Sequence, residues 1–188
     1  MSAKSSTNGQ NVYQLHVTLR DSDPPIWRRL QVTGNTSLAK LHWILQMAMG
    51  WTNSHLHQFI VGGQYFSDPE FEVEETADET GMTLARLKLE DNSQFVYEYD
   101  FGDSWLHDIL IEKVLSPEKD IRYPRCLDGE RAAPPEDCGG LWGYAELLEA
   151  IHDPTHPEHE SLLEWLGEPF DPDAFDLAAV NRSLRSLR

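Results

Sequence analysis

Basic residues and cysteines are both scarce in this chain of 188 residues. It has 15 Lys and Arg against 32 Asp and Glu, which gives a net charge of −17, and it has two cysteines. A protein that neutralises nucleic-acid phosphates needs a basic face, so the charge disfavours direct nucleic-acid binding. Two cysteines are too few for a disulfide framework, and we expect them to be free thiols in a reducing compartment.

Apolar runs of membrane-spanning length are also missing from the sequence. No stretch approaches the roughly 20 apolar residues that a spanning helix needs, and the opening MSAKSSTNGQ has no apolar segment of the signal-peptide type. We therefore expect a cytoplasmic protein without membrane association. Residues 1–11 are expected to be a disordered tail, and residues 12–188 have the usual size of a single domain.

Alternating apolar residues predict a sheet in the first part of the chain. The expected strands are residues 12–20, 26–32, 55–61, 64–66, 95–101 and 105–115. Between them, residues 68–81 hold seven acids and no base, a composition typical of a solvated loop. After Pro117 we expect a proline-containing loop, followed by helices.

Helix patterns appear once inside the sheet region and again near the end of the chain. Ser37 is placed to cap a helix over residues 38–50, which Gly50 ends. Its expected buried stripe is Leu38, Leu41, Leu45 and Ala48. The later helices are expected at residues 144–152, 157–166 and 171–187. This order predicts an α+β fold, in which a mixed or antiparallel sheet packs on a helix in the β-grasp manner, with a helical C-terminal part.

Three stretches are dense in side chains that bind metals or transfer protons: GWTNSHLHQF, YDFGDSWLHD and CLDGERAAPPEDCGG. Alternate residues on a strand face the same side, so the pair His55 and His57 can ligate one metal ion. If the stretches converge, a divalent metal is the cofactor that they would hold. The candidate ligands are His57, Asp103, His107, Cys126 and Cys138. The candidate general bases are Glu136 and Asp137.

Each of these features also has a purely structural explanation. The two cysteines are separated by eleven residues and lack the close C-x(2–4)-C pair of zinc fingers. Asp103 can cap its own turn, and Pro134-Pro135 stiffens a loop whether or not the loop binds anything. The DFG at residues 100–102 stands without the other kinase motifs, and no hydrolase, metalloprotease or P-loop motif occurs. Whether the protein is an enzyme therefore stays open.

Several long motifs in a fixed order carry a resemblance to a known family. They are PPIWRRL, the GW and HLHQF stretch, YDFGDSWLH, YPRCLDGERAAPPEDCGG and FDPDAFDLAAVN. Together they resemble the plasmid pRiA ORF-three-like family from about Val12 to Leu184. The resemblance implies a single α+β domain and an association with plasmids and insertion elements, where some members are labelled as resolvase-like. It supplies no catalytic residues.

Three hypotheses for function follow. The first is an accessory or binding protein of plasmids or mobile elements that acts through an unidentified protein partner, with exposed tryptophans as anchors. The candidate anchors are Trp27, Trp51, Trp105 and Trp142, which fill the core in the alternative interpretation. The second is a metal-dependent hydrolase or nuclease built on the His and carboxylate residues. The third is a DNA-binding regulator or resolvase-like protein, for which Arg28-Arg29 is a small basic pair.

Overall fold

The computed structural model describes residues 11–187, so the predicted tail lies outside the described residues apart from Asn11. The strands are β1 (Val12–Leu19), β2 (Trp27–Thr33), β3 (His57–Val61), β4 (Gln64–Ser67), β5 (Thr76–Asp78), β6 (Gln94–Tyr99), β7 (Trp105–Leu115) and β8 (Arg125–Glu130). The helices are α1 (Leu38–Met49), η2 (Pro69–Phe71), α2 (Leu84–Leu87), α3 (Gly140–His152), α4 (His159–Leu166) and α5 (Leu177–Ser186). Among the described residues, no helix is both long and apolar enough to cross a membrane.

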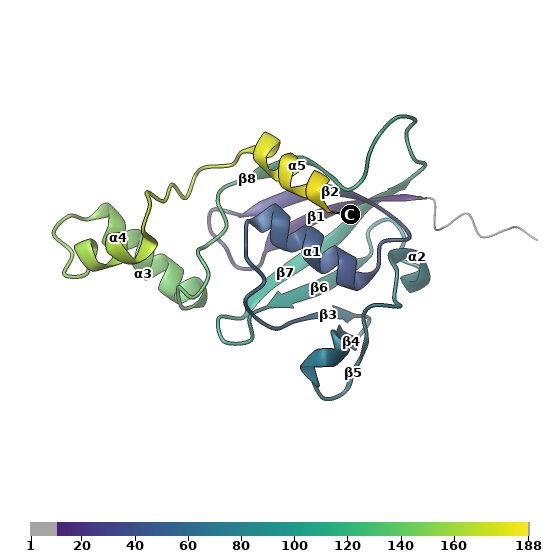
Figure 1. Ribbon diagram of the computed structural model, residues 1–188, viewed down its shortest axis with the longest axis horizontal. Coiled ribbons are helices and arrows are strands. Elements are labelled where there is room, and N and C mark those ends of the chain that lie inside the picture. The colour runs from purple at the N-terminus through teal and green to yellow at the C-terminus, as the bar shows by residue number, and fades with distance from the viewer. Residues whose placement is uncertain (1–10, 188) are drawn as a thin grey trace, which may run out of the picture.

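The strands form one sheet in the order β5-β4-β3-β6-β7-β1-β2-β8. Neighbouring strands pair antiparallel, except β4 and β5, which run parallel. Helix α1 lies across one face of this sheet, and α5 lies beside it near β2 and β8 (Figure 1). The predicted α+β class, with a sheet packed on a helix, is confirmed.

Helix α1 forms where the sequence predicts it. The Ser37 hydroxyl accepts a hydrogen bond from the backbone N–H of Lys40, and Gly50 ends the helix with a φ of 84°. That left-handed conformation favours glycine because it lacks a Cβ. The predicted stripe is buried against the sheet, as expected of an amphipathic helix: Leu38, Leu41, Leu45 and Ala48.

Strand β8 forms in the middle of the segment after Pro117 that we expected to be a loop. It pairs antiparallel with β2 at the edge of the sheet, with Cys126 opposite Leu30. Asn181 of α5 accepts from the backbone N–H of Cys126 and donates to its carbonyl oxygen. The sequence RCLDGE lacks apolar alternation, and a helix remote in sequence satisfies this part of its backbone. The pattern of the segment itself therefore could not predict the strand.

The acidic run is also not a fully solvated loop. It contains β5, and Glu79 at its end is only 2% exposed. Both oxygens of the Glu79 carboxylate lie within hydrogen-bonding distance of Nε2 of His57, at 3.0 and 3.1 Å. A buried carboxylate needs such a partner, and this one comes from β3, outside the run.

The C-terminal helices differ from the prediction mainly at their starts. Helix α3 begins at Gly140, four residues before the predicted start, and α5 begins at Leu177 rather than Asp171. The carboxylate that caps α5 belongs to Asp176, which accepts from Ala179 N. Helices α3 and α4 pack on each other to one side of the sheet (Figure 1).

The basic pair Arg28-Arg29 does not form a free phosphate-binding surface. Arg28 is 3% exposed and donates to the carbonyl oxygens of Trp27, Ala48 and Glu130. Its pKa falls to about 10 because burial disfavours the charged form. Arg29 makes a two-point ion pair with Glu112 on the opposite face of the sheet. Both guanidinium groups are therefore already engaged.

Two of the four predicted tryptophan anchors are part of the core. Trp51 is 8% exposed and Trp105 is 1% exposed, so neither can serve as a surface anchor. Trp27 is half-buried and stacks on His16. Trp142, in contrast, is 87% exposed.

Buried histidines make the stability of the fold sensitive to acid. Burial, reinforced by the neighbouring His57, lowers the pKa of His42 to about 3, and burial lowers the pKa of His107 to about 4. An unfolded histidine titrates at about 6.5. Between that pH and the lowered native values, the unfolded chain binds more protons than the folded chain, so stability falls as the pH falls.

We expect the free energy of unfolding, measured by urea denaturation, to decrease from about pH 7 to about pH 5 through these two rings. The variant His42→Gln keeps a side chain able to hydrogen-bond Tyr97 and Asn53 but removes one titrating group, so its stability should depend less steeply on pH. His152→Gln, on the surface of α3, should leave the slope unchanged. Equal slopes for wild type and His42→Gln would contradict the assignment.

Candidate metal centre

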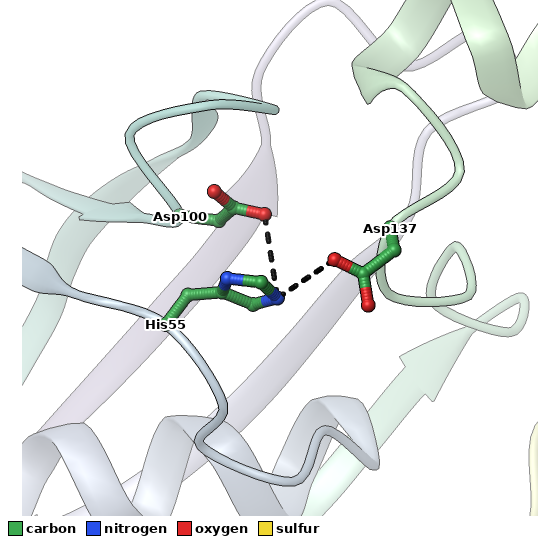
Figure 2. Close-up of side chains that lie close together, drawn as sticks. All are labelled: His55, Asp100 and Asp137. Carbon is green, nitrogen blue, oxygen red and sulfur yellow. Dashed lines mark ion pairs between the residues drawn. The ribbon is translucent and has the colours of Figure 1, made fainter.

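Three loops bring His55, Asp100 and Asp137 together at one end of the sheet (Figure 2). Nε2 of His55 lies 3.0 Å from an oxygen of Asp137 and 3.6 Å from an oxygen of Asp100. One donor atom from each of the three residues lies within 4.8 Å of the other two, the one such group of His, Cys, Asp and Glu side chains among residues 11–187. The three residues belong to the three stretches that the sequence marks as chemically dense.

The separations are those of ligands that share one metal ion. Ligands about 2.1 Å from a tetrahedral zinc ion lie about 3.4 Å from one another, close to both separations from His55. Nε2 of His55 is buried and makes no hydrogen bond within the described residues, although it faces both carboxylates. One imidazole and two carboxylates suit zinc, manganese or iron(II).

The Asp100 carboxylate is oriented by its own turn. Asp100 has a φ of 58°, and its Oδ1 accepts from the backbone N–H groups of Gly102 and Asp103. These bonds leave Oδ2 directed toward His55. Asp100 is 7% exposed, so the turn holds a nearly buried carboxylate in a fixed position.

A second contact fixes the loop of Asp137 against that turn. Oδ2 of Asp103 accepts from the backbone N–H of Gly139, two residues after Asp137. Gly140 adopts a φ of 68°, and a Cβ there would lie 2.7 Å from the carbonyl oxygen of Asp103. Only glycine permits this close approach. Asp103 therefore joins two of the loops that form the cluster, and the side chain that caps its turn is that of Asp100.

Glu136 attaches the same loop to the segment before His55. Its carboxylate accepts from the backbone and hydroxyl of Thr52 and from the hydroxyl of Tyr99. Burial raises the pKa of Glu136, but these hydrogen bonds outweigh it, so the pKa lies below its usual range. Trp51 adds an N–H bond to the carbonyl of Pro134. The prolines and Glu136 thus position the loop.

A pocket of about 390 Å³ adjoins the cluster. His55 and Asp100 line it together with Asn53, Ser54, Leu56, Phe71, Phe101 and Gly102. Leu56 and Phe101 are 40% and 39% exposed, so the pocket offers apolar as well as polar contacts. Asp137 is 68% exposed and leaves the cluster open to solvent on its side.

The structure does not bring the ligands predicted from the sequence into one group. His57 pairs with Glu79, and His107 is buried with Nδ1 against the carbonyl of Trp105. The Cys126 thiol donates to the carbonyl of Asp128, and burial raises its pKa to about 11. Burial also raises the pKa of Cys138, to about 12. Both thiols remain free and are protonated at neutral pH, which makes them poor nucleophiles.

His55, Asp100 and Asp137 all lie in stretches that the sequence marks as chemically dense, but the sequence did not predict that these three would converge. In the H-x-H pair, the first histidine lies before β3 begins, and the second turns into the core. The two therefore do not act as strand neighbours. Asp137, considered as a general base, faces His55 directly (Figure 2). The sequence feature that could have identified His55 and Asp100 is that each lies in a turn next to a strand.

The chain is similar to proteins of one family. The description "plasmid pRiA4b ORF-3-like protein" belongs to the family that matches residues 11–179. "Uncharacterized protein y4hQ" of Sinorhizobium fredii (strain NBRC 101917 / NGR234) is 37% identical over 180 residues, which cover 94% of this chain and 92% of that protein. The crystal structure of a "protein of unknown function", MM3350 of Methanosarcina mazei Go1, has a TM-score of 0.80 at 37% identity and covers 89% of this chain and 96% of that chain. The chain therefore belongs to the plasmid pRiA4b ORF-3-like protein family.

Proposed function

We propose that this protein binds a divalent metal ion through His55, Asp100 and Asp137 and uses it as a hydrolase of small substrates. The observation that carries the proposal is that three donor atoms from three different loops converge beside an open pocket. Hydrogen bonds join these loops to one another. A metal held by three protein ligands keeps a position for water, whose pKa it lowers. The metal would also polarise the bond to be cleaved.

The surroundings support a small substrate over a nucleic-acid strand. The pocket of about 390 Å³ matches the volume of a small molecule, and Leu56 and Phe101 favour an apolar or aromatic group. The net charge of −17 would repel a polyphosphate backbone. Glu136 is not the general base in this proposal, because Thr52 and Tyr99 occupy its carboxylate.

His55→Ala is expected to weaken zinc or manganese binding at least tenfold, because it removes the one nitrogen ligand of the group. Isothermal titration of the purified, chelator-treated protein with each metal alone measures the change. His152→Ala, which removes an exposed histidine from α3, is the matched control and should bind as the wild type does. If His55 only forms ion pairs with the two aspartates, the wild type and both variants will show no stoichiometric binding.

The hydrolase step needs its own measurement. The metal-loaded protein should hydrolyse p-nitrophenyl acetate or p-nitrophenyl phosphate, and both chelation and His55→Ala should abolish the activity. Stoichiometric metal binding without hydrolysis of either ester would support the metal site but contradict the proposed hydrolase activity.

A second candidate function is that of an accessory protein of plasmids or mobile elements, acting in the cytoplasm through a protein partner. The supporting observation is the 87% exposure of Trp142, in a part of the chain where Trp165 is 48% exposed. Large exposed aromatic side chains are frequent anchors at interfaces. Cross-linking in the source cell should connect a partner to this region. A DNA-binding role receives no comparable support, because Arg28 and Arg29 are already engaged.

A further inference from the structure

Helices α3 and α4 enclose a second pocket, which we name the acidic groove. It has a volume of about 320 Å³, and its lining includes Asp137, Glu146, Leu147, Glu158, Leu162 and Trp165. The two helices stand to one side of the sheet (Figure 1). None of the residues that line the groove lines the pocket beside His55. Of the residues that line the groove, the proposed metal site uses Asp137 alone, and it uses no residue of α3 or α4.

The floor of the groove is apolar and its edge carries an exposed aromatic ring. Leu147 is 3% exposed and Leu162 is half-buried, whereas Trp165 is 48% exposed. Trp142 lies four residues before Glu146 on α3, so the two share one side of the helix. An exposed tryptophan beside an apolar floor resembles the grooves that receive the apolar face of an amphipathic helix.

The charge around the groove has a single sign. Residues 132–176 contain twelve Asp and Glu and no Lys or Arg. Glu146 lies on α3, Glu158 directly precedes α4, and both are exposed. No ion pair within the described residues uses either carboxylate. The matching surface would therefore combine apolar residues with Lys or Arg.

We propose that the acidic groove binds a basic amphipathic helix of a partner protein, an inference that rests on the second proposed function, protein contact. Apolar residues of the helix would pack on Leu147, Leu162 and Trp165, while its cations would face Glu146 and Glu158. A second copy of the chain fits less well, because each copy carries a net charge of −17. Nucleic acid is repelled for the same reason.

The experiment titrates the full chain with a fluorescein-labelled amphipathic peptide made of Leu and Lys, and follows fluorescence anisotropy. A peptide of Leu and Glu with the same pattern is the charge control and should not bind. Binding of the Leu and Lys peptide should weaken as salt rises. Trp165→Ala and Trp142→Ala should each weaken it about tenfold, in the range of an interface anchor. Since Trp142 is 87% exposed, its replacement leaves folding intact.

A matched pair of charge variants separates the groove from general acidity. Glu146→Gln with Glu158→Gln should weaken peptide binding and flatten its salt dependence. Glu74→Gln with Glu90→Gln removes the same charge from exposed positions elsewhere and should have little effect. No binding at low salt, or equal losses in both double variants, would overturn the proposal. A partner that cross-links to this region but does not compete with the basic peptide would support the proposed protein contact. It would contradict the proposal that the acidic groove binds a basic helix.

Discussion

Glu79→Ala is expected to destabilise the protein by about 3 kcal/mol, the upper end of the cost of leaving a buried polar group without its hydrogen-bond partner. For a domain of this size, the melting temperature should fall by roughly 6–12 °C. The reason is the environment of His57, which is 2% exposed and has the Glu79 carboxylate as the partner of its Nε2. Without that carboxylate, a buried polar ring loses its hydrogen bond.

The surroundings of His57 offer no substitute. Its ring stacks on His42 at 3.5 Å between centroids with an interplanar angle of 7°, and Phe71 meets it edge-on. Its Nδ1 is also buried without a hydrogen-bond partner among the described residues. The ring therefore cannot turn to solvent without leaving the core.

Urea denaturation of matched variants measures the effect. Glu74→Ala removes an exposed acid from the same run and should change stability by less than about 0.5 kcal/mol. A Glu79→Ala variant as stable as Glu74→Ala would show that the pair contributes no net stability.

The run that contains Glu79 illustrates what the sequence can and cannot predict. Its acids show no apolar period, so composition alone favours a solvated loop. Glu79 is the one buried acid of the run, and it is buried because its carboxylate pairs with His57, which lies 22 residues away. The sheet region was predictable because alternating side chains record which face of each strand is buried.

The candidate metal centre could likewise be predicted from the sequence only in part. The types of side chain and the three stretches that supply them could be predicted, since His and Asp at turns are conspicuous in the sequence. The members could not be chosen, because each choice depends on a contact between loops. Asp103 holds Gly139, and Glu136 holds Thr52, so the predicted ligand and the predicted base position the loop that carries Asp137.

Gly143→Ala is expected to weaken metal binding at the candidate centre about tenfold or more, a loss of about 1.4 kcal/mol. Gly143 lies in α3, and a Cβ there would overlap the carbonyl oxygen of Cys138. Real structures do not contain so short a contact, so that carbonyl must move. Since Cys138 follows Asp137 directly, the displacement should separate Asp137 from His55.

Helix propensity opposes this expectation and gives the experiment its control. Ala is better than Gly inside a helix by about 1 kcal/mol, so propensity alone predicts that Gly143→Ala stabilises the protein. Ala145→Gly, at an exposed position of the same helix, should cost about that much and leave zinc affinity unchanged. Zinc titration and urea denaturation of both variants distinguish the two effects. A more stable Gly143→Ala protein with wild-type zinc affinity would show that the loop does not need its close approach to α3, and the cluster would then owe its geometry to the contacts of Asp103 and Glu136 alone.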